Sequence, residues 1–281
     1  MASEAIPETV RRLLASQPIE LPIFHPVALK LQRMLSNYDF TVDEVSQVAC
    51  EDMSLASQML KIANSPMYMG RTKVATIKEA VIRLGAQQVI NLVIAASQAS
   101  VHSSLNPALD HYMKKMWLHS HGCALGGRWL AHSCGMRGVA DETYLAGLLH
   151  DVGKLYLLKS IENLVTAGVI NSLYNAELIR EIFETMHVEQ GYRIMQHWNF
   201  PVMYCEVIRD HHAEEWDTVN KMLAIVRFSN MACHRVGLGL KHEPDLVLIT
   251  TQEAEILDIT DTQILALEAM LEETRVSALE G

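Results

Sequence analysis

Helical signals run through nearly all of this 281-residue chain, and they constrain its fold more than any other feature. Two capping boxes, Thr41-Val-Asp-Glu44 and Thr76-Ile-Lys-Glu79, each precede apolar residues spaced three and four apart. Gly85 follows the second run, where a helix commonly ends on a glycine. No segment alternates polar and apolar residues between turn signals, as a half-buried strand does. The sequence therefore predicts an all-α protein.

Further helices are expected along the rest of the chain. The first capping box opens one helix, and Ser54 is expected to cap the next one, which carries Leu55 and Met59. The stretch from Ser100 to Pro107, with three serines and a proline, indicates a joint. Helical patterns cover residues 86–99, 109–131, 142–158, 176–196, 202–211, 222–234 and 262–279. The last of these is either a packing helix or a surface for a homodimer.

The charge balance argues against nucleic acid as a partner. Lys and Arg number 23 against 33 Asp and Glu, which gives a formal net charge of −10. Binding to a phosphate backbone needs clustered basic residues. The chain has only short basic pairs such as Arg11-Arg12 and Lys114-Lys115.

The first residues of the chain and its cysteines predict the cellular compartment. The first ten residues lack the basic and apolar regions of a secretory signal. The most apolar stretch, residues 89–96, is too short to cross a bilayer, which needs about 20 apolar residues. Five cysteines, an odd number with no CxxC pair, indicate reduced thiols. We expect a cytoplasmic protein that does not contact membranes.

The segment Leu148-Leu-His-Asp-Val-Gly-Lys154 carries the densest chemical signal. Its adjacent His150 and Asp151 offer an imidazole nitrogen and a carboxylate oxygen to one ion. Such a mixed donor set suits divalent Zn, Mn or Fe rather than Ca. Gly153 removes a side chain beside them, and Lys154 is a candidate contact for a phosphate.

More histidines stand at positions that could complete a metal site. The chain has 13, and four of them lie in His119-Ser120, Glu184-Thr-Met-His187 and His211-His212. Histidines from separate helices that face one bundle interior are a common way to build a metal centre. His121 competes with His119 for the first position, and the remaining histidines, His234 included, have no partner in this pattern. The candidate ligands are His119, His150, Asp151, His187, His211 and His212.

With these residues the sequence resembles the HD superfamily, and more closely its HDOD branch (HD-related output domains). The HD pattern has a His followed by Ser, then His-Asp, further histidines and a late Asp. Here Asn230 stands where that Asp is expected. The HDOD likeness also rests on other strings between about residues 20 and 215. They are Leu21-Pro-Ile-Phe-His-Pro-Val-Ala28, Asp52-Met-Ser-Leu55, Leu60-Lys-Ile-Ala-Asn-Ser-Pro-Met-Tyr68, Ile77-Lys-Glu-Ala-Val-Ile-Arg-Leu-Gly85, Glu189-Gln-Gly191 and Trp198-Asn-Phe-Pro201.

The resemblance implies a multi-helix bundle with an N-terminal helical subdomain and an HD-like helical core. We expect the HDOD domain over residues 15–215, divided near residue 105, with the C-terminal helices of residues 216–281 packed on the core. The sequence disfavours a cyclic-dinucleotide phosphodiesterase of the HD-GYP type. The residues after the double His, Ala213-Glu-Glu-Trp-Asp217, contain no Gly-Tyr-Pro loop.

Two functions stay open at this point. The resemblance implies a regulatory module of bacterial signal transduction, with protein partners and a partly retained HD metal site. The alternative that it implies is a metal-dependent phosphohydrolase acting on a nucleotide or other phosphate ester. In that enzyme Asp151 and Lys154 would be catalytic, and the metal would be Mn, Fe, Zn or Ni. Asn230 leaves the site one negative charge short of the HD pattern, so the enzyme assignment stays open.

Overall fold

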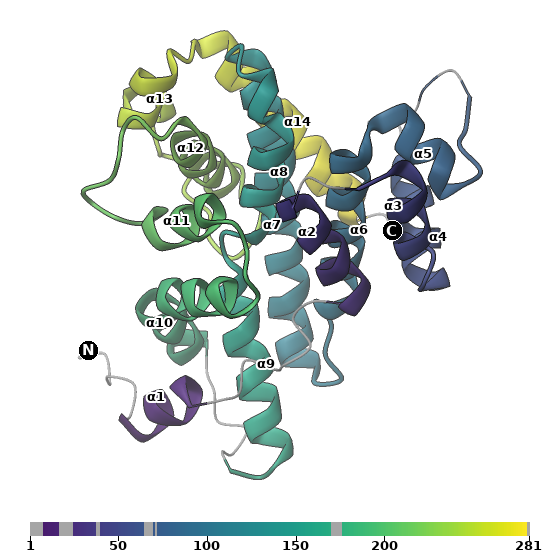
Figure 1. The fold of residues 1–281 in the computed structure, drawn as a ribbon. Coiled ribbons are helices and arrows are strands. Elements are labelled where there is room, and N and C mark those ends of the chain that lie inside the picture. The colour runs from purple at the N-terminus through teal and green to yellow at the C-terminus, as the bar shows by residue number, and fades with distance from the viewer. Residues whose placement is uncertain are drawn as a thin grey trace. The chain divides into compact units, whose positions relative to one another are not determined.

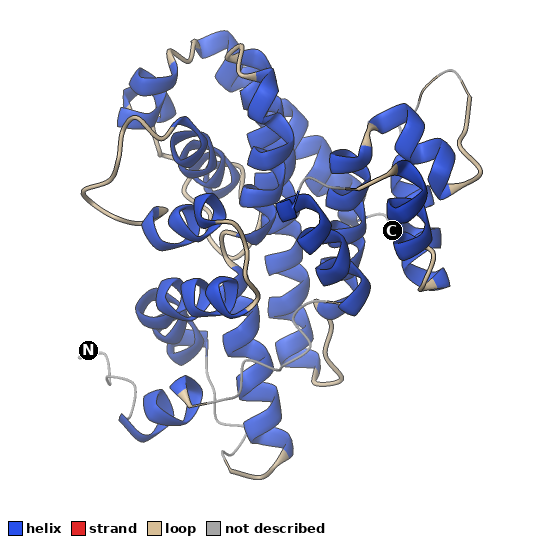
Figure 2. Ribbon diagram, viewed as in Figure 1, coloured by secondary structure: helices blue, strands red, loops and turns tan. Residues whose placement is uncertain are grey.

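The protein is helical throughout the part of the chain that the structure describes (Figure 2). The structure is a computed structural model that describes residues 8–16, 25–37, 40–64, 70, 72–169 and 176–279. No strand occurs among these residues, which confirms the all-α prediction. Parts of two family strings, residues 21–24 and 65–68, lie outside the described residues.

The chain divides into two compact units. The smaller unit comprises Phe24–Val101 and Trp198–Pro201. Its helices are α2 Pro26–Asn37, α3 Val42–Ala49, α4 Met53–Ala63, α5 Ile77–Leu84 and α6 Ala86–Val101 (Figure 1). Helix α6 contacts each of the other four and is buried from Gln88 to Gln98. It is therefore the central helix of this unit.

Local signals determine where the helices of the smaller unit begin and end. Both predicted capping boxes are present, at Thr41 and at Thr76. Gly85 ends α5 with a φ of 87°, a conformation that favours glycine. The prediction for Ser54 is wrong. Asp52 caps α4 instead, because its Oδ1 accepts a hydrogen bond from the Leu55 amide at 2.8 Å.

The larger unit comprises Met1–Ile23, His102–His197 and Val202–Gly281. Its α-helices are α1 Glu8–Ala15, α7 Pro107–Ser133, α8 Ala140–Leu149, α9 Val152–Thr166, α10 Ala176–His197, α11 Val202–Asp210, α12 Lys221–Arg235, α13 Gln252–Leu257 and α14 Asp261–Leu279. Two short 3₁₀ turns join them, η1 Arg137–Val139 and η2 Leu248–Thr250.

Helix α7 is the central element of the larger unit. It packs against α8, α9, α12 and α14. Helix α14 buries Ile264, Leu267 and Leu271 in the same core as Leu130 of α7. The last predicted helix therefore packs within its own unit. None of the helices in the described ranges has the length and apolarity needed to cross a membrane.

The single helix predicted over residues 142–158 is wrong, because the chain breaks it at His150 and Asp151. Helix α8 ends at Leu149 and α9 begins at Val152. Glycines on either side of the break let the two helices dock on different neighbours. A Cβ on Gly147 would lie 2.6 Å from the Cys123 carbonyl oxygen, and one on Gly153 would overlap the His187 carbonyl. The break thus follows from packing against α7 and α10.

Candidate metal centre

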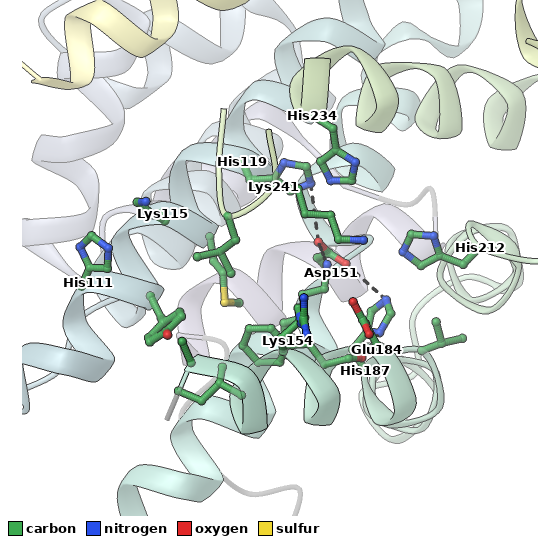
Figure 3. Close-up of a pocket in the computed structure, with 18 residues that line it drawn as sticks. His111, Lys115, His119, Asp151, Lys154, Glu184, His187, His212, His234 and Lys241 are labelled. Carbon is green, nitrogen blue, oxygen red and sulfur yellow. Dashed lines mark hydrogen bonds and ion pairs between the residues drawn. The ribbon is translucent and has the colours of Figure 1, made fainter. Parts of the chain in front are cut away.

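The carboxylate of Asp151 lies at the centre of a ring of imidazoles in the larger unit. Asp151 is 3% exposed. Its Oδ2 lies 3.4 Å from His150 Nε2 and 3.6 Å from His119 Nε2. Its Oδ1 lies 3.6 Å from Nε2 of both His187 and His211. Figure 3 shows Asp151 between His119 and His187, which come from α7 and α10.

Each of these four imidazoles is held at Nδ1 by a backbone carbonyl. The carbonyl partners are Leu238 for His119 at 3.0 Å, Gly147 for His150 at 2.8 Å, Phe183 for His187, and Ile208 for His211 at 2.8 Å. A carbonyl only accepts hydrogen bonds, so Nδ1 carries the proton in every case. Each Nε2 therefore faces Asp151. Metal-binding histidines are oriented in the same way.

The charges at the centre match what a cation requires. Burial alone would raise the pKa of Asp151, but the Lys154 ammonium and the His150 imidazole hold it well below its usual value. Burial lowers the pKa of His187 to about 3. Near neutral pH the carboxylate is therefore ionised and this imidazole is neutral, which are the metal-binding forms of both groups.

Two buried polar atoms at the centre have no hydrogen-bond partner in the part of the chain that the structure describes. They are His150 Nε2 and Asp151 Oδ1. Leaving a buried acceptor unsatisfied costs about 1–3 kcal/mol, and more for a charged one. A divalent cation would satisfy both. The donor atoms form two compact sets, each within 4.8 Å: Asp151, His187, His211 and His212 in one, and His119, Cys123 and His150 in the other. These residues fit a divalent transition metal.

The six predicted ligands are brought together. His212 is the most exposed of them, and its ring lies 5.1 Å from that of His187. His121 takes no part in either donor set, because its ring stacks on Trp117. Lys154 donates to Asp151 Oδ2 at 2.6 Å, so its ammonium already compensates the carboxylate. Its predicted contact with a phosphate stays a prediction.

A cavity of about 500 Å³ opens beside Asp151. Four basic residues line it: Lys115, Lys154, Arg180 and Lys241. Its apolar wall consists of Tyr112, Met116, Ile179, Phe183 and Leu240. Figure 3 shows Lys154 and Lys241 beside Asp151, with Lys115 and His111 on the other side of the cavity. A cavity with this lining suits an anionic ligand that also carries an apolar group.

Comparison with known proteins identifies the family. The family model of the HDOD domain matches residues 21–214. The chain belongs to the HDOD family. Over its matched 229 residues it is 25% identical to a curated relative, and it spans 43% of that relative's length.

Solved structures share the fold of this HDOD protein. An HDOD protein of unknown function from Geobacter sulfurreducens superposes with a TM-score of 0.72 at 24% identity, covering 96% of this chain and 95% of the other. A candidate metal-dependent phosphohydrolase from Shewanella amazonensis gives 0.65 at 18%, covering 94% and 97%. A candidate signal transduction protein from Marinobacter aquaeolei gives 0.61 at 19%, covering 96% and 63%. At these identities the likeness shows the fold.

One histidine of the HDOD centre was missed by sequence reasoning. His234 lines the cavity and stacks on His119, with ring centroids 5.2 Å apart and planes 16° apart. Burial, followed by the neighbouring His119, lowers its pKa to about 3. Asn230, the residue expected at the position of the late Asp of the HD pattern, lies one turn earlier on α12 and is buried. The spacing of four residues between Asn230 and His234 could have indicated this position, because it places both side chains on one helix face.

A second residue that the sequence did not indicate, Arg227, binds the backbone around the double histidine. Its Nη1 donates to the carbonyls of Asp210, His211 and Ala213 at 3.0–3.1 Å. Its Nε donates to Glu253 at 2.6 Å. These carbonyls lie at the end of α11, where the helix leaves them without helical partners. Arg227 thus anchors the turn that presents His211.

Proposed function

We propose that this HDOD domain is a regulatory module of bacterial signal transduction that binds a divalent cation and an anionic phosphate ester at Asp151. The observation that carries the proposal is the ring of four imidazoles, each fixed at Nδ1 and turned toward one buried carboxylate. A histidine cluster without a use would not need four separate backbone carbonyls to orient it. The basic cavity beside it supplies the second binding site.

The regulatory assignment draws on the family and on one relative. The HDOD resemblance implies signalling modules, and the Marinobacter protein is named as a candidate signal transduction protein. In this assignment ligand binding at Asp151 would alter contacts with a protein partner. Asn230 in place of the late Asp weakens the case for turnover, because the centre has one carboxylate fewer than the HD pattern.

A metal-dependent phosphohydrolase is the second candidate, and the open cavity favours it. A bound divalent metal would lower the pKa of water and polarise a phosphoryl oxygen. Lys241 and Arg180, which line the cavity, would bind the phosphate, and Asp151 would hold the ion. The Shewanella protein with this fold is named as a candidate enzyme of that type.

The proposal is tested by metal analysis of protein purified without chelator. Wild type is expected to hold, or to take up, a stoichiometric amount of Mn, Fe, Zn or Ni, and Asp151→Asn is expected to lose most of it. Asp141→Asn is the control, because Asp141 pairs with Arg128 away from the centre. Absence of metal from the wild type under every loading condition would overturn the proposal.

Phosphate esters then separate the two candidates. Wild type loaded with metal is assayed with a panel of nucleotides, cyclic dinucleotides and simple esters, for both binding and hydrolysis. Binding without turnover supports the regulatory module. Turnover that disappears in Asp151→Asn supports the phosphohydrolase, whereas turnover that survives in that variant comes from a contaminant.

A further inference from the structure

A cysteine completes one face of the proposed metal centre. Cys123 follows His119 by one turn of α7, and its side chain is 0% exposed. Its Sγ lies 3.6 Å from His119 Nε2. A ring nitrogen of His150 lies within 4.8 Å of Cys123 Sγ and of a ring nitrogen of His119. His150 Nε2 is buried and has no hydrogen-bond partner among the described residues. Three donor atoms from α7 and from the turn after α8 therefore converge on one point.

The spacing of these donors matches a tetrahedral metal site. Zinc binds cysteine sulfur at about 2.3 Å and histidine nitrogen at about 2.0–2.1 Å. At the tetrahedral angle, those bond lengths separate sulfur and nitrogen by about 3.6 Å. The observed distance between Cys123 Sγ and His119 Nε2 is 3.6 Å. The pair therefore needs little rearrangement to bind one ion.

Ordinary core packing does not account for this arrangement. A buried cysteine usually behaves as a small apolar residue, and Cys205 is a buried example elsewhere in the protein. Cys123 differs because it faces an imidazole whose other nitrogen is already bonded to the Leu238 carbonyl. Nε2 of that imidazole and the sulfur thus face each other.

We propose that Cys123 is a thiolate ligand of a thiophilic ion, Zn²⁺ or Fe²⁺, that His119 and His150 also bind. The inference rests on the proposed function, because both histidines belong to the centre around Asp151. On binding, the Cys123 S–H bond breaks heterolytically, the sulfur keeps the electron pair, and the proton passes to solvent. As a thiol, Cys123 donates its S–H to Cys233 Sγ at 3.6 Å. Once Cys123 has lost that proton, Cys233 can turn its own S–H toward the thiolate. A sulfur ligand selects Zn²⁺ or Fe²⁺ over Mg²⁺ and Mn²⁺.

Cobalt(II) reports a sulfur ligand directly. The full chain is loaded with Co²⁺, and its absorption is recorded in the near ultraviolet, where cobalt–thiolate charge transfer occurs. Wild type is expected to show that band. Cys123→Ser and Cys123→Ala are expected to lose it and to bind Zn²⁺ about 10–100-fold more weakly, while Mn²⁺ affinity changes less. Calorimetry in two buffers should show that each Cys123 variant releases one proton fewer than the wild type when it binds Zn²⁺.

Two matched variants serve as controls. Cys134→Ser changes a half-buried thiol outside the centre, and Cys205→Ser changes a buried one. Both are expected to retain the band. Circular dichroism shows whether each variant folds. Because two different replacements are made at Cys123, the test still applies if one of them does not fold.

Three outcomes decide the inference. Stoichiometric Co²⁺ in wild type without a charge-transfer band would overturn the thiolate ligand and leave the proposed function standing. A band that persists in Cys123→Ser would also overturn it. Failure of wild type to bind Co²⁺, Zn²⁺ or Fe²⁺ at all would overturn the metal centre itself, and the inference with it.

Discussion

The backbone of Gly153 lies directly against the carbonyl oxygen of His187, so closely that a methyl group on Gly153 would overlap it. The same Cβ would meet the Gly191 amide nitrogen at 2.7 Å. This contact is between backbone atoms of α9 and α10, and neither helix has a flexible side chain there to move aside. The packing therefore sets the position of His187 relative to Asp151.

Gly153→Ala is expected to push α10 away from α9 and to displace His187. Overpacking of this kind costs about 1–3 kcal/mol of unfolding free energy. Metal affinity should fall as well, because His187 Nε2 would leave Asp151. Urea unfolding and metal titration measure the two effects. Gly138→Ala, where a Cβ meets no atom within 4 Å, should leave both unchanged. A Gly153→Ala protein with wild-type affinity would show that α10 can shift freely.

Arg227→Lys is expected to weaken metal binding without removing any ligand. A lysine ammonium cannot bond Glu253 and the three carbonyls at the end of α11 together, as the guanidinium does. Loss of such supporting contacts typically lowers metal affinity about 10–100-fold. Isothermal titration with Zn²⁺ measures the change.

Arg209→Lys is the matched control for Arg227. Arg209 pairs with Asp210 on an exposed part of α11, and exposed ion pairs contribute about 0–1 kcal/mol. Its metal affinity should equal that of the wild type. Equal losses in both variants would indicate a general weakening of α11 instead of a specific anchor at His211.

His234 is expected to make the metal-free protein sensitive to acid. Its pKa is about 3 in the folded protein, against an ordinary value of 6.5, chiefly because the side chain is buried. Above pH 6.5 the group is neutral in both states and has no effect. Below that value the unfolded chain takes up a proton that the folded chain does not, so stability falls as the pH falls toward 3. By about pH 5 this one group costs up to roughly 2 kcal/mol.

Urea unfolding between about pH 7 and pH 5, with chelator present, measures this effect. His234→Gln removes the titrating group, so its unfolding free energy should fall less steeply with acid than that of the wild type. Parallel curves for the two proteins would mean that the pKa of His234 is the same in the folded and the unfolded protein.

Features encoded locally could be predicted from the sequence. The capping box at Thr41 needs only residues three apart, and the string around His150 carries its chemistry in adjacent residues. The helix break at His150 could not be predicted, because the apolar period continues across it and the break depends on the contact of Gly153 with α10.

Residues supplied by distant loops and helices escaped prediction for the same reason. His234 enters the centre through its stacking on His119, which lies more than a hundred residues earlier. The Leu238 carbonyl, which orients His119, comes from the loop after α12 and carries no side-chain signal at all. Pairings of this kind are set by tertiary packing alone.

Asn64 is expected to stabilise the smaller unit through three hydrogen bonds. Its Nδ2 donates to the carbonyls of Leu60 and Val74 at 3.0 and 2.9 Å, and its Oδ1 accepts from the Val74 amide at 2.9 Å. These bonds tie the end of α4 to the segment that leads into α5. Asn64→Ala leaves the Val74 backbone groups without these partners, at a cost of about 1–3 kcal/mol. Thermal unfolding followed by circular dichroism measures it. Ser57→Ala, which removes only an exposed hydroxyl bond to Met53, should change stability by less than about 0.5 kcal/mol. Asn64→Asp should cost at least as much as Asn64→Ala, because a carboxylate oxygen would then face the carbonyl oxygens of Leu60 and Val74. A loss for Asn64→Ala as small as that of Ser57→Ala would contradict the assignment.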